Sequence, residues 1–331
     1  MKKTLAIATA LTTAFLTFSL AQNASALTNV QSDNGLNFDV QDITDEDDGG
    51  INDGGNDAFD DFGMIRIQVS DGNGILTNDQ ELNGFGLTFD GGRRFNTTTP
   101  VTVSGINVTR SLFTPAGTNY MRYIDTFTNT SNSALNLLVA WGGDLGSDGI
   151  TTVAATASGD LTIGTNDTWA LTIEDDGGLF NPAGPATDPP VGYVVGNNSI
   201  LSSIGDYDSN PFVNSWPGNG NEDLAFVYNL SLQAGQSTSL AYFLYRGLQE
   251  NNTGPLGQQP TTGQEIALAQ TVLANLAQNP NFSDLTPQQR GMIANFTTPA
   301  ATVPEPASTL GLLAVGAIGA TSALKRKNKQ N

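Results

Sequence analysis

The sequence predicts a mainly β protein: an antiparallel β-sandwich with two short C-terminal helices, flanked by a signal peptide and a C-terminal transmembrane helix. Short runs of β-branched and aromatic residues alternate with Gly, Asn and Asp turns at intervals of about ten residues from Met64 onward. The hydrophobic period becomes helical near residue 262, and both ends of the chain carry apolar segments beside basic residues. Regular short strands with polar turns are typical of an antiparallel sandwich.

The first 26 residues have the three parts of a secretory signal peptide. Lys2 and Lys3 give a positive start, an apolar run extends from Leu5 to Leu20, and Ala24 and Ala26 place small residues at the cleavage position. We therefore predict cleavage after Ala26. The alternative is an N-terminal membrane anchor, for which the apolar stretch is short.

Residues 27–63 form an acidic segment rich in Asp and Gly. Glycines permit tight loops that wrap carboxylate oxygens around a hard cation, so we expect Asp45, Asp47, Asp53 and Asp57 to be candidate Ca²⁺ ligands. No standard loop fits, because an EF-hand starting at Asp45 would need Glu at its twelfth position, where Asn56 stands. A solvated acidic loop is the alternative interpretation.

Residues 64–250 form the predicted β-sandwich region. Its strands are expected at 64–69, 86–89, 101–113 (broken around Gly105), 120–130, 134–141, 150–157, 168–174, 224–232 and 239–246. In the strand at 224–232, alternation puts large apolar side chains on one face: Leu224, Phe226, Tyr228, Leu230 and Leu232. We expect 239–246 to be its hairpin partner, with the turn at Ala234-Gly235.

Two long loops interrupt these strands. The first, 175–190, contains Pro182, Pro185, Pro189 and Pro190, and Pro cannot donate to a central ladder. The second, 206–223, surrounds Trp216, and loops of this length are usually functional or mobile. Trp216 is either a platform that stacks on a sugar or an anchor that fixes the loop to the sandwich.

Asp144 and Asp148 are the best local pair of carboxylates. Glycoside hydrolysis uses two such groups, and it is the one catalytic scheme left open to ordinary side chains in a chain without His or Cys. The pair follows the strand that ends at Trp141, in a Gly-rich turn. The same geometry suits Ca²⁺ binding or plain turn capping by Asp, and all three interpretations stay open.

Residues 262–298 are expected to form a pair of helices. Thr262 and Glu265 have the spacing of a capping box, an apolar face follows, and Asn279-Pro280 ends the first helix. Thr286-Pro287 begins the second helix. The expected buried residues are Ile266, Ala269, Leu273 and Leu276 in the first helix, and Ile293 and Phe296 in the second. A partly helical linker is the alternative.

Residues 303–329 form a tail in three parts. Val303, Pro304, Glu305 and Pro306 come first, 18 uncharged residues follow at 307–324, and the chain ends in a basic cluster. An 18-residue helix measures roughly 27 Å. This is marginally enough to span a bilayer core, so we predict a transmembrane helix at 307–324 with its basic end in the cytoplasm.

Together with the signal peptide, this tail resembles the PEP-CTERM sorting signals of exported proteins in Gram-negative bacteria, including many cyanobacteria. The resemblance covers residues 303–331. It implies that a membrane-embedded exosortase recognises Pro304-Glu305-Pro306 and removes the tail, and that the protein is associated with extracellular polysaccharide or biofilm matrix. An ordinary C-terminal membrane anchor is the alternative.

The composition excludes several function classes. The chain contains no His and no Cys, so it has neither imidazole-dependent nucleophiles nor disulfides. Residues 27–304 hold seven Arg, no Lys and 31 of the 32 acids, which gives this region a net charge of −24. Binding to nucleic acid needs clustered cations and is not expected.

We therefore expect a non-enzymatic, exported protein of the cell surface or extracellular matrix. Its expected partners are signal peptidase, exosortase, extracellular polysaccharide and, transiently, the inner membrane. One alternative is a Ca²⁺-dependent carbohydrate-binding or adhesion module, favoured by a shallow groove with exposed Trp or Tyr. Another is a polysaccharide hydrolase, favoured by a cleft with two carboxyl groups about 5–10 Å apart.

Overall fold

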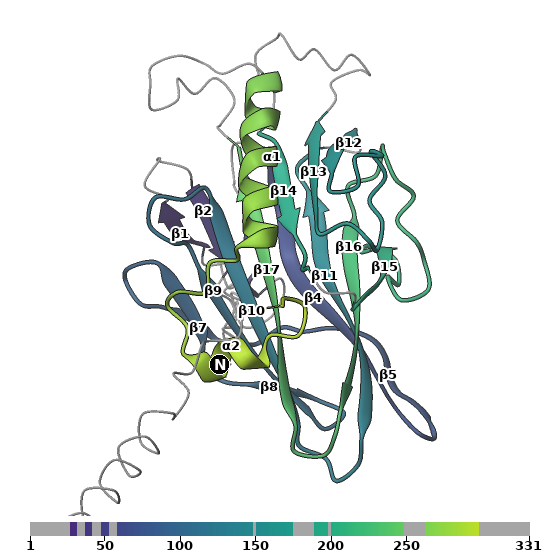
Figure 1. The fold of residues 1–331 in the computed structure, drawn as a ribbon. Coiled ribbons are helices and arrows are strands. Elements are labelled where there is room, and N and C mark those ends of the chain that lie inside the picture. The colour runs from purple at the N-terminus through teal and green to yellow at the C-terminus, as the bar shows by residue number, and fades with distance from the viewer. Residues whose placement is uncertain are drawn as a thin grey trace, which may run out of the picture.

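The structure, a computed structural model, describes residues 27–31, 37–41, 48–52, 58–147, 150–174, 189–197, 200–247 and 262–297. Within these residues, two antiparallel sheets pack face to face, and two helices lie against the outer face of one sheet (Figure 1). The prediction of a mainly β protein with two short helices is confirmed.

The eight-stranded sheet is built around the long strands β4 and β11. From one edge to the other, its order is β1 (Leu27–Gln31), β2 (Asn37–Gln41), β3 (Ile51–Asn52), β4 (Phe59–Asp71), β11 (Leu135–Leu145), β16 (Leu224–Leu232) and β15 (Leu201–Asp206). In addition, β5 (Gly74–Glu81) pairs with the second half of β4. The sheet thus begins well before Met64, because β1–β3 from the acidic segment join it.

The nine-stranded sheet has β17 and β10 at its centre. Its order is β12 (Thr151–Thr156), β13 (Trp169–Glu174), β14 (Val191–Val194), β17 (Ser237–Arg246), β10 (Tyr120–Asn129), β9 (Ile106–Phe113), β7 (Arg94–Thr97) and β6 (Leu87–Phe89). The short β8 (Val101–Val103) pairs with β9, so the predicted strand at 101–113 is broken by a turn at Ser104-Gly105.

The predicted hairpin between 224–232 and 239–246 is wrong. β16 pairs with β11 and β15 in one sheet, whereas β17 pairs with β10 and β14 in the other. The turn at Gly235 therefore carries the chain from one sheet to the other. A short connection between two apolar strands fits a hairpin within one sheet and a passage from one sheet to the other equally well. In either arrangement each strand buries one face in the same core.

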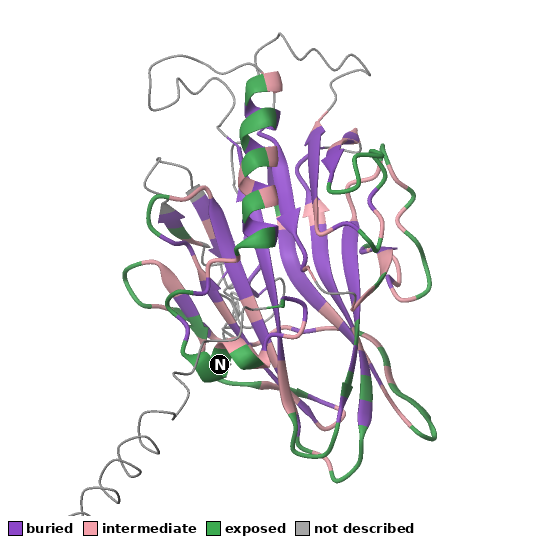
Figure 2. Ribbon diagram, in the orientation of Figure 1, coloured by how far each residue is buried: buried purple, intermediate pink, exposed green. Residues whose placement is uncertain are grey.

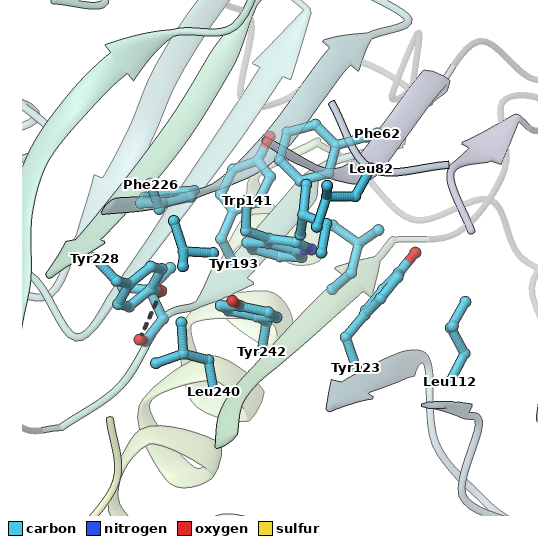
Figure 3. Close-up of a cluster of buried hydrophobic side chains, with 14 of the residues drawn as sticks. Phe62, Leu82, Leu112, Tyr123, Trp141, Tyr193, Phe226, Tyr228, Leu240 and Tyr242 are labelled. Atoms are coloured by element: carbon cyan, nitrogen blue, oxygen red, sulfur yellow. Dashed lines mark hydrogen bonds between the residues drawn. The ribbon is translucent and has the colours of Figure 1, made fainter. Parts of the chain in front are cut away.

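The core between the sheets is centred on Trp141 from β11 (Figure 3). Its ring stacks on Tyr242 at 4.6 Å between centroids and meets the edge of Phe62 at 5.3 Å. The five alternating residues of β16 all point into this core, as the sequence predicts. Burial is concentrated in the central strands, while the connecting loops are largely exposed (Figure 2).

Helix α1 (Thr262–Gln278) packs on β13, β14, β12 and β17, and α2 (Pro287–Met292) packs on β17. All six predicted core residues are buried there, in a second apolar cluster on the outer face of the nine-stranded sheet. Ile293 and Phe296 follow α2 rather than lie in it, because the helix ends at Met292. Thr286 caps α2, and its capping box with Gln289 is complete. The two predicted helices are thus confirmed.

The predictions for the two chain ends concern residues outside the described part of the chain. These are the signal peptide with Ala24 and Ala26, the tail with Val303, Pro304, Glu305 and Pro306, and the transmembrane helix at 307–324. Among the residues that the structure does describe, no helix has the length and apolarity needed to cross a membrane.

Candidate functional site

Acidic side chains gather at one edge of the eight-stranded sheet. Because neighbouring strands are antiparallel, the starts of β4 and β16 meet the end of β11 there. The acidic edge consists of Asp60 and Asp61 at the start of β4, Asp144 near the end of β11, and Glu222 and Asp223 just before β16.

The backbone of β11 is distorted just before Asp144. A β-bulge between Gly142 and Asp144 shifts the register against β4, and bulges re-aim the side chains that follow them. A Cβ on Gly143 would lie 2.2 Å from the carbonyl oxygen of Asp61, so only Gly fits. Asp61 itself has a φ of 75°, which is rare for a residue with a side chain and often marks functional sites.

The position of Asp144 favours its protonated form. Burial raises the pKa of Asp144 to about 7, and the charges of Glu222, Asp223, Asp60 and Asp61 add to the effect. Its Oδ1 atom is buried and has no hydrogen-bond partner among the described residues. A carboxyl group in this setting holds a proton near neutral pH.

Two further carboxyl groups of the acidic edge are shifted in the same direction. Burial raises the pKa of Asp223 to about 6, helped by the charges of Asp208, Asp206 and Glu222. Burial also raises the pKa of Asp61, although its carboxylate accepts hydrogen bonds from the side-chain amides of Gln41 and Asn52. The acidic edge is therefore a set of coupled carboxyl groups rather than a row of independent charges.

The structure tests only part of the predicted carboxylate chemistry. Asp144 lies in β11 at the bulge, not in a turn after Trp141, so the turn-capping interpretation of this residue is wrong. Asp148 lies outside the described residues, as do the four candidate Ca²⁺ ligands Asp45, Asp47, Asp53 and Asp57. Within the described part of the chain, no three acidic side chains are placed to hold a metal ion together.

Trp216 anchors its loop. Its indole nitrogen donates a hydrogen bond to the backbone oxygen of Asn221 at 3.1 Å, and its half-buried ring packs against the main core. The loop is held to the sheet edge by an isolated bridge between Gly205 and Ser215. These contacts favour the anchor over the sugar-stacking platform.

The comparison with family models identifies the type of sequence motif in the C-terminal tail. Residues 302–327 match the model of the PEP-CTERM protein-sorting motif. The chain carries a PEP-CTERM protein-sorting motif. This agrees with the resemblance inferred from the tail, and it indicates an exported protein with a C-terminal sorting signal that an exosortase processes.

The other comparisons give no closer relationship. No curated protein matches the chain. Among solved structures, a polysaccharide lyase has a TM-score of 0.36 and 14% identity over 67% of this chain and 30% of its own length. A putative kojibiose phosphorylase from the human microbiome has a TM-score of 0.36 and 11% identity. The match covers 68% of this chain and 26% of the phosphorylase. The chain thus spans less than a third of either protein, and TM-scores this low assign neither fold nor activity.

Sequence reasoning treated the members of the acidic edge separately. Asp60 and Asp61 belonged to the acidic segment, and Glu222 and Asp223 to the loop around Trp216. The sequence feature that points to the acidic edge is the position of the acids, which stand beside the starts of two predicted strands and the end of a third. In an antiparallel sheet such ends converge, but only if the strands are neighbours, and that pairing was not visible in the sequence.

Replacing Asp144 with Asn should flatten the pH dependence of stability between pH 5 and 8. The pKa of Asp144 rises from 3.8 to about 7 on folding, so the folded protein binds the extra proton in this window. Stability is therefore greatest below it and falls as the pH rises through 7. Asn mimics the protonated group, so the variant should be more stable than the natural protein at pH 8.

Thermal melts at pH 5 and pH 8 measure this effect. Asp71→Asn is the control, because hydrogen bonds from Asn73 and Gly74 lower the pKa of this residue at the end of β4 and keep it ionised throughout the window. If Asp144→Asn loses as much stability as the natural protein between pH 5 and pH 8, Asp144 does not titrate there.

Proposed function

We propose that this chain is an exported protein of the cell surface or extracellular matrix, delivered by an exosortase-type system, and that its sandwich acts there without catalysis. The observation that carries the proposal is the PEP-CTERM motif at residues 302–327. The N-terminal pattern of Lys2, Lys3 and a small-residue cleavage site supports the same route.

The composition supports a binding or structural role. The chain has no His or Cys, and the region between its two end signals has a charge of −24. Such a charge favours solubility and opposes non-specific association in a crowded matrix.

Replacing Pro304, Glu305 and Pro306 together with Ala should keep the protein in the inner membrane. An exosortase that recognises this motif would no longer release the tail, and the apolar run at 307–324 would remain as an anchor. Cell fractionation with an antibody to the sandwich measures the outcome.

The control carries the same number of Ala substitutions at Thr302, Ser308 and Thr309, which lie on either side of Pro304-Glu305-Pro306. This variant should leave the membrane as the natural protein does. Release of the Pro304-Glu305-Pro306 variant at the normal level would refute the sorting route.

Calcium binding by the acidic segment remains a proposal about residues outside the described part of the chain. Its support is the density of Asp and Gly around Asp45, Asp47, Asp53 and Asp57. Calorimetric titration with CaCl₂ at constant ionic strength tests it, with the four-fold Asp→Asn variant as the control.

A further inference from the structure

A groove of about 340 Å³ lies between α2 and the outer face of the nine-stranded sheet. This size falls near the lower end of small-ligand sites, which measure on the order of 300–1,000 Å³. The strands β7, β9, β10 and β17 supply the floor, and α2 and the residues just before it supply one wall. The groove is therefore bounded by regular structure rather than by loops.

The strand register arranges the outward-facing side chains in three cross-strand rows. The rows are Arg94–Phe113–Arg122, Asn96–Ser111–Ile124 and Thr109–Thr126–Ser239. Ser111 donates to the side-chain oxygen of Asn96 at 3.0 Å, and the hydroxyl groups of Thr126 and Ser239 lie 2.8 Å apart. The floor therefore consists mainly of hydroxyl and amide groups, which surround one apolar side chain, that of Ile124.

The first row brings two guanidinium groups to this end of the groove. Arg94 and Arg122 share a single carboxylate, that of Asp284. Burial alone would raise the pKa of Asp284, but hydrogen bonds and charge attraction from the two guanidinium groups lower it to about 2. Asp90 is a second carboxylate beside Arg94, and its Oδ1 atom accepts hydrogen bonds from the backbone N–H groups of its own turn, including that of Arg94 at 3.1 Å.

The residues that line the groove differ in charge from the protein as a whole. None of the described residues that line the groove is Asp or Glu, although 31 acids lie between residues 27 and 304. The acidic edge belongs to the other sheet. An anion repelled by most of this protein would thus be attracted here.

Arg94 is the lining side chain that can receive such an anion. Its guanidinium group lies over the ring of Phe113, 4.2 Å from the centroid, and its Nη2 atom donates to Asp284. Among the described residues, its Nε and Nη1 atoms have no hydrogen-bond acceptor. A guanidinium held in one plane with donors to spare is suited to a carboxylate.

We propose that this groove binds a uronate residue of an acidic polysaccharide, with the sugar carboxylate on Arg94. The ring hydroxyl groups of the sugar then meet the hydroxyl and amide groups of the floor. Its apolar C–H face has Ile124, Leu285 and Met292 to pack against. The biological setting rests on the proposed extracellular location, but the site itself does not.

Calorimetric titration of the full-length chain in non-ionic detergent tests the proposal. The probes are tetragalacturonate, its carboxyl-reduced neutral counterpart and free galacturonate. The acidic tetramer should bind at least about tenfold more tightly than the neutral one, which is the usual contribution of one charge-assisted hydrogen bond. Galacturonate alone should compete for the same site, because one sugar residue carries the contact.

Two pairs of variants locate the site. Arg94→Gln should weaken tetragalacturonate binding about tenfold or more. Arg290→Gln removes the same charge from α2, at a position outside the groove lining. This control should change the binding by about twofold at most. Ser111→Glu and Ser111→Gln place side chains of equal size in the groove. The Glu variant should bind about tenfold more weakly than the Gln variant, because only Glu repels the ligand.

Equal melting temperatures for the two members of each pair exclude differences in folding. Equal binding of acidic and neutral tetramers, equal losses in the Arg94 and Arg290 variants, or no binding of any probe would overturn the proposal. Because the protein is purified, these results do not depend on where the cell delivers it. The proposed export route can therefore fail while the groove is confirmed, and the reverse also holds.

Discussion

Replacing Asp125 with Ala should destabilise the protein by about 3–5 kcal/mol, because it leaves a buried cation unpaired. Asp125 of β10 and Arg110 of β9 are directly opposite in the register, and both side chains point into the core between the sheets. The pair is bidentate, with distances of 2.8 and 3.0 Å, and neither side chain is exposed. Arg110 cannot give up its proton, since the Asp125 charge offsets burial and holds its pKa above the usual value.

Urea unfolding at pH 5 is the appropriate measurement. Asp48 lies near Arg110, and burial raises the pKa of Asp48 to about 6, so at pH 5 it is mostly protonated and cannot take the place of Asp125. The double variant Arg110→Met, Asp125→Leu is the control, because it removes both charges and should regain most of the loss. A loss below about 1 kcal/mol in Asp125→Ala would show that the pair does not stabilise the core.

Replacing Trp141 with Ala should also cost about 3–5 kcal/mol, here because it opens a cavity between the two sheets. Trp141 is fully buried and contacts aromatic rings from both sheets, including Tyr242 at 4.6 Å and Phe226 at 6.0 Å between centroids (Figure 3). The surrounding rings belong to two sheets and cannot all move inward to fill the space.

Unfolding followed by circular dichroism measures the loss without relying on the fluorescence of the residue removed. Trp216→Ala is the matched control, because that ring is half-buried in a loop and should cost less than half as much. Equal losses in the two variants would contradict the placement of Trp141 at the centre of the core.

The elements of this fold could be predicted where side-chain pattern and local chemistry agree. The alternation from Leu224 to Leu232 gave the strand and its buried face correctly, and Thr286-Pro287 gave the start of α2. Strands without such a pattern were not predicted. In β5, Ile75 and Leu76 are exposed, so there is no apolar face to detect.

The pairing of strands, and with it both candidate sites, could not be predicted. Whether β17 follows β16 in the same sheet or crosses to the other depends on contacts with distant strands. The acidic edge requires β4, β11 and β16 to be neighbours, and the groove requires Asp284 to reach Arg94, 190 residues earlier in the chain. No local spacing encodes these contacts, so the sequence contained the residues of each site without indicating which of them meet.

The export route is tested most directly by the intact mass of the protein recovered from outside the cells. The N-terminal pattern that predicts a signal peptide and the PEP-CTERM motif each predict where the chain is cut. We predict a protein that begins at Leu27 and lacks both the apolar run at 307–324 and the basic end. Protein found only inside the cells, with residues 1–26 and 307–331 still attached, would contradict the proposed function.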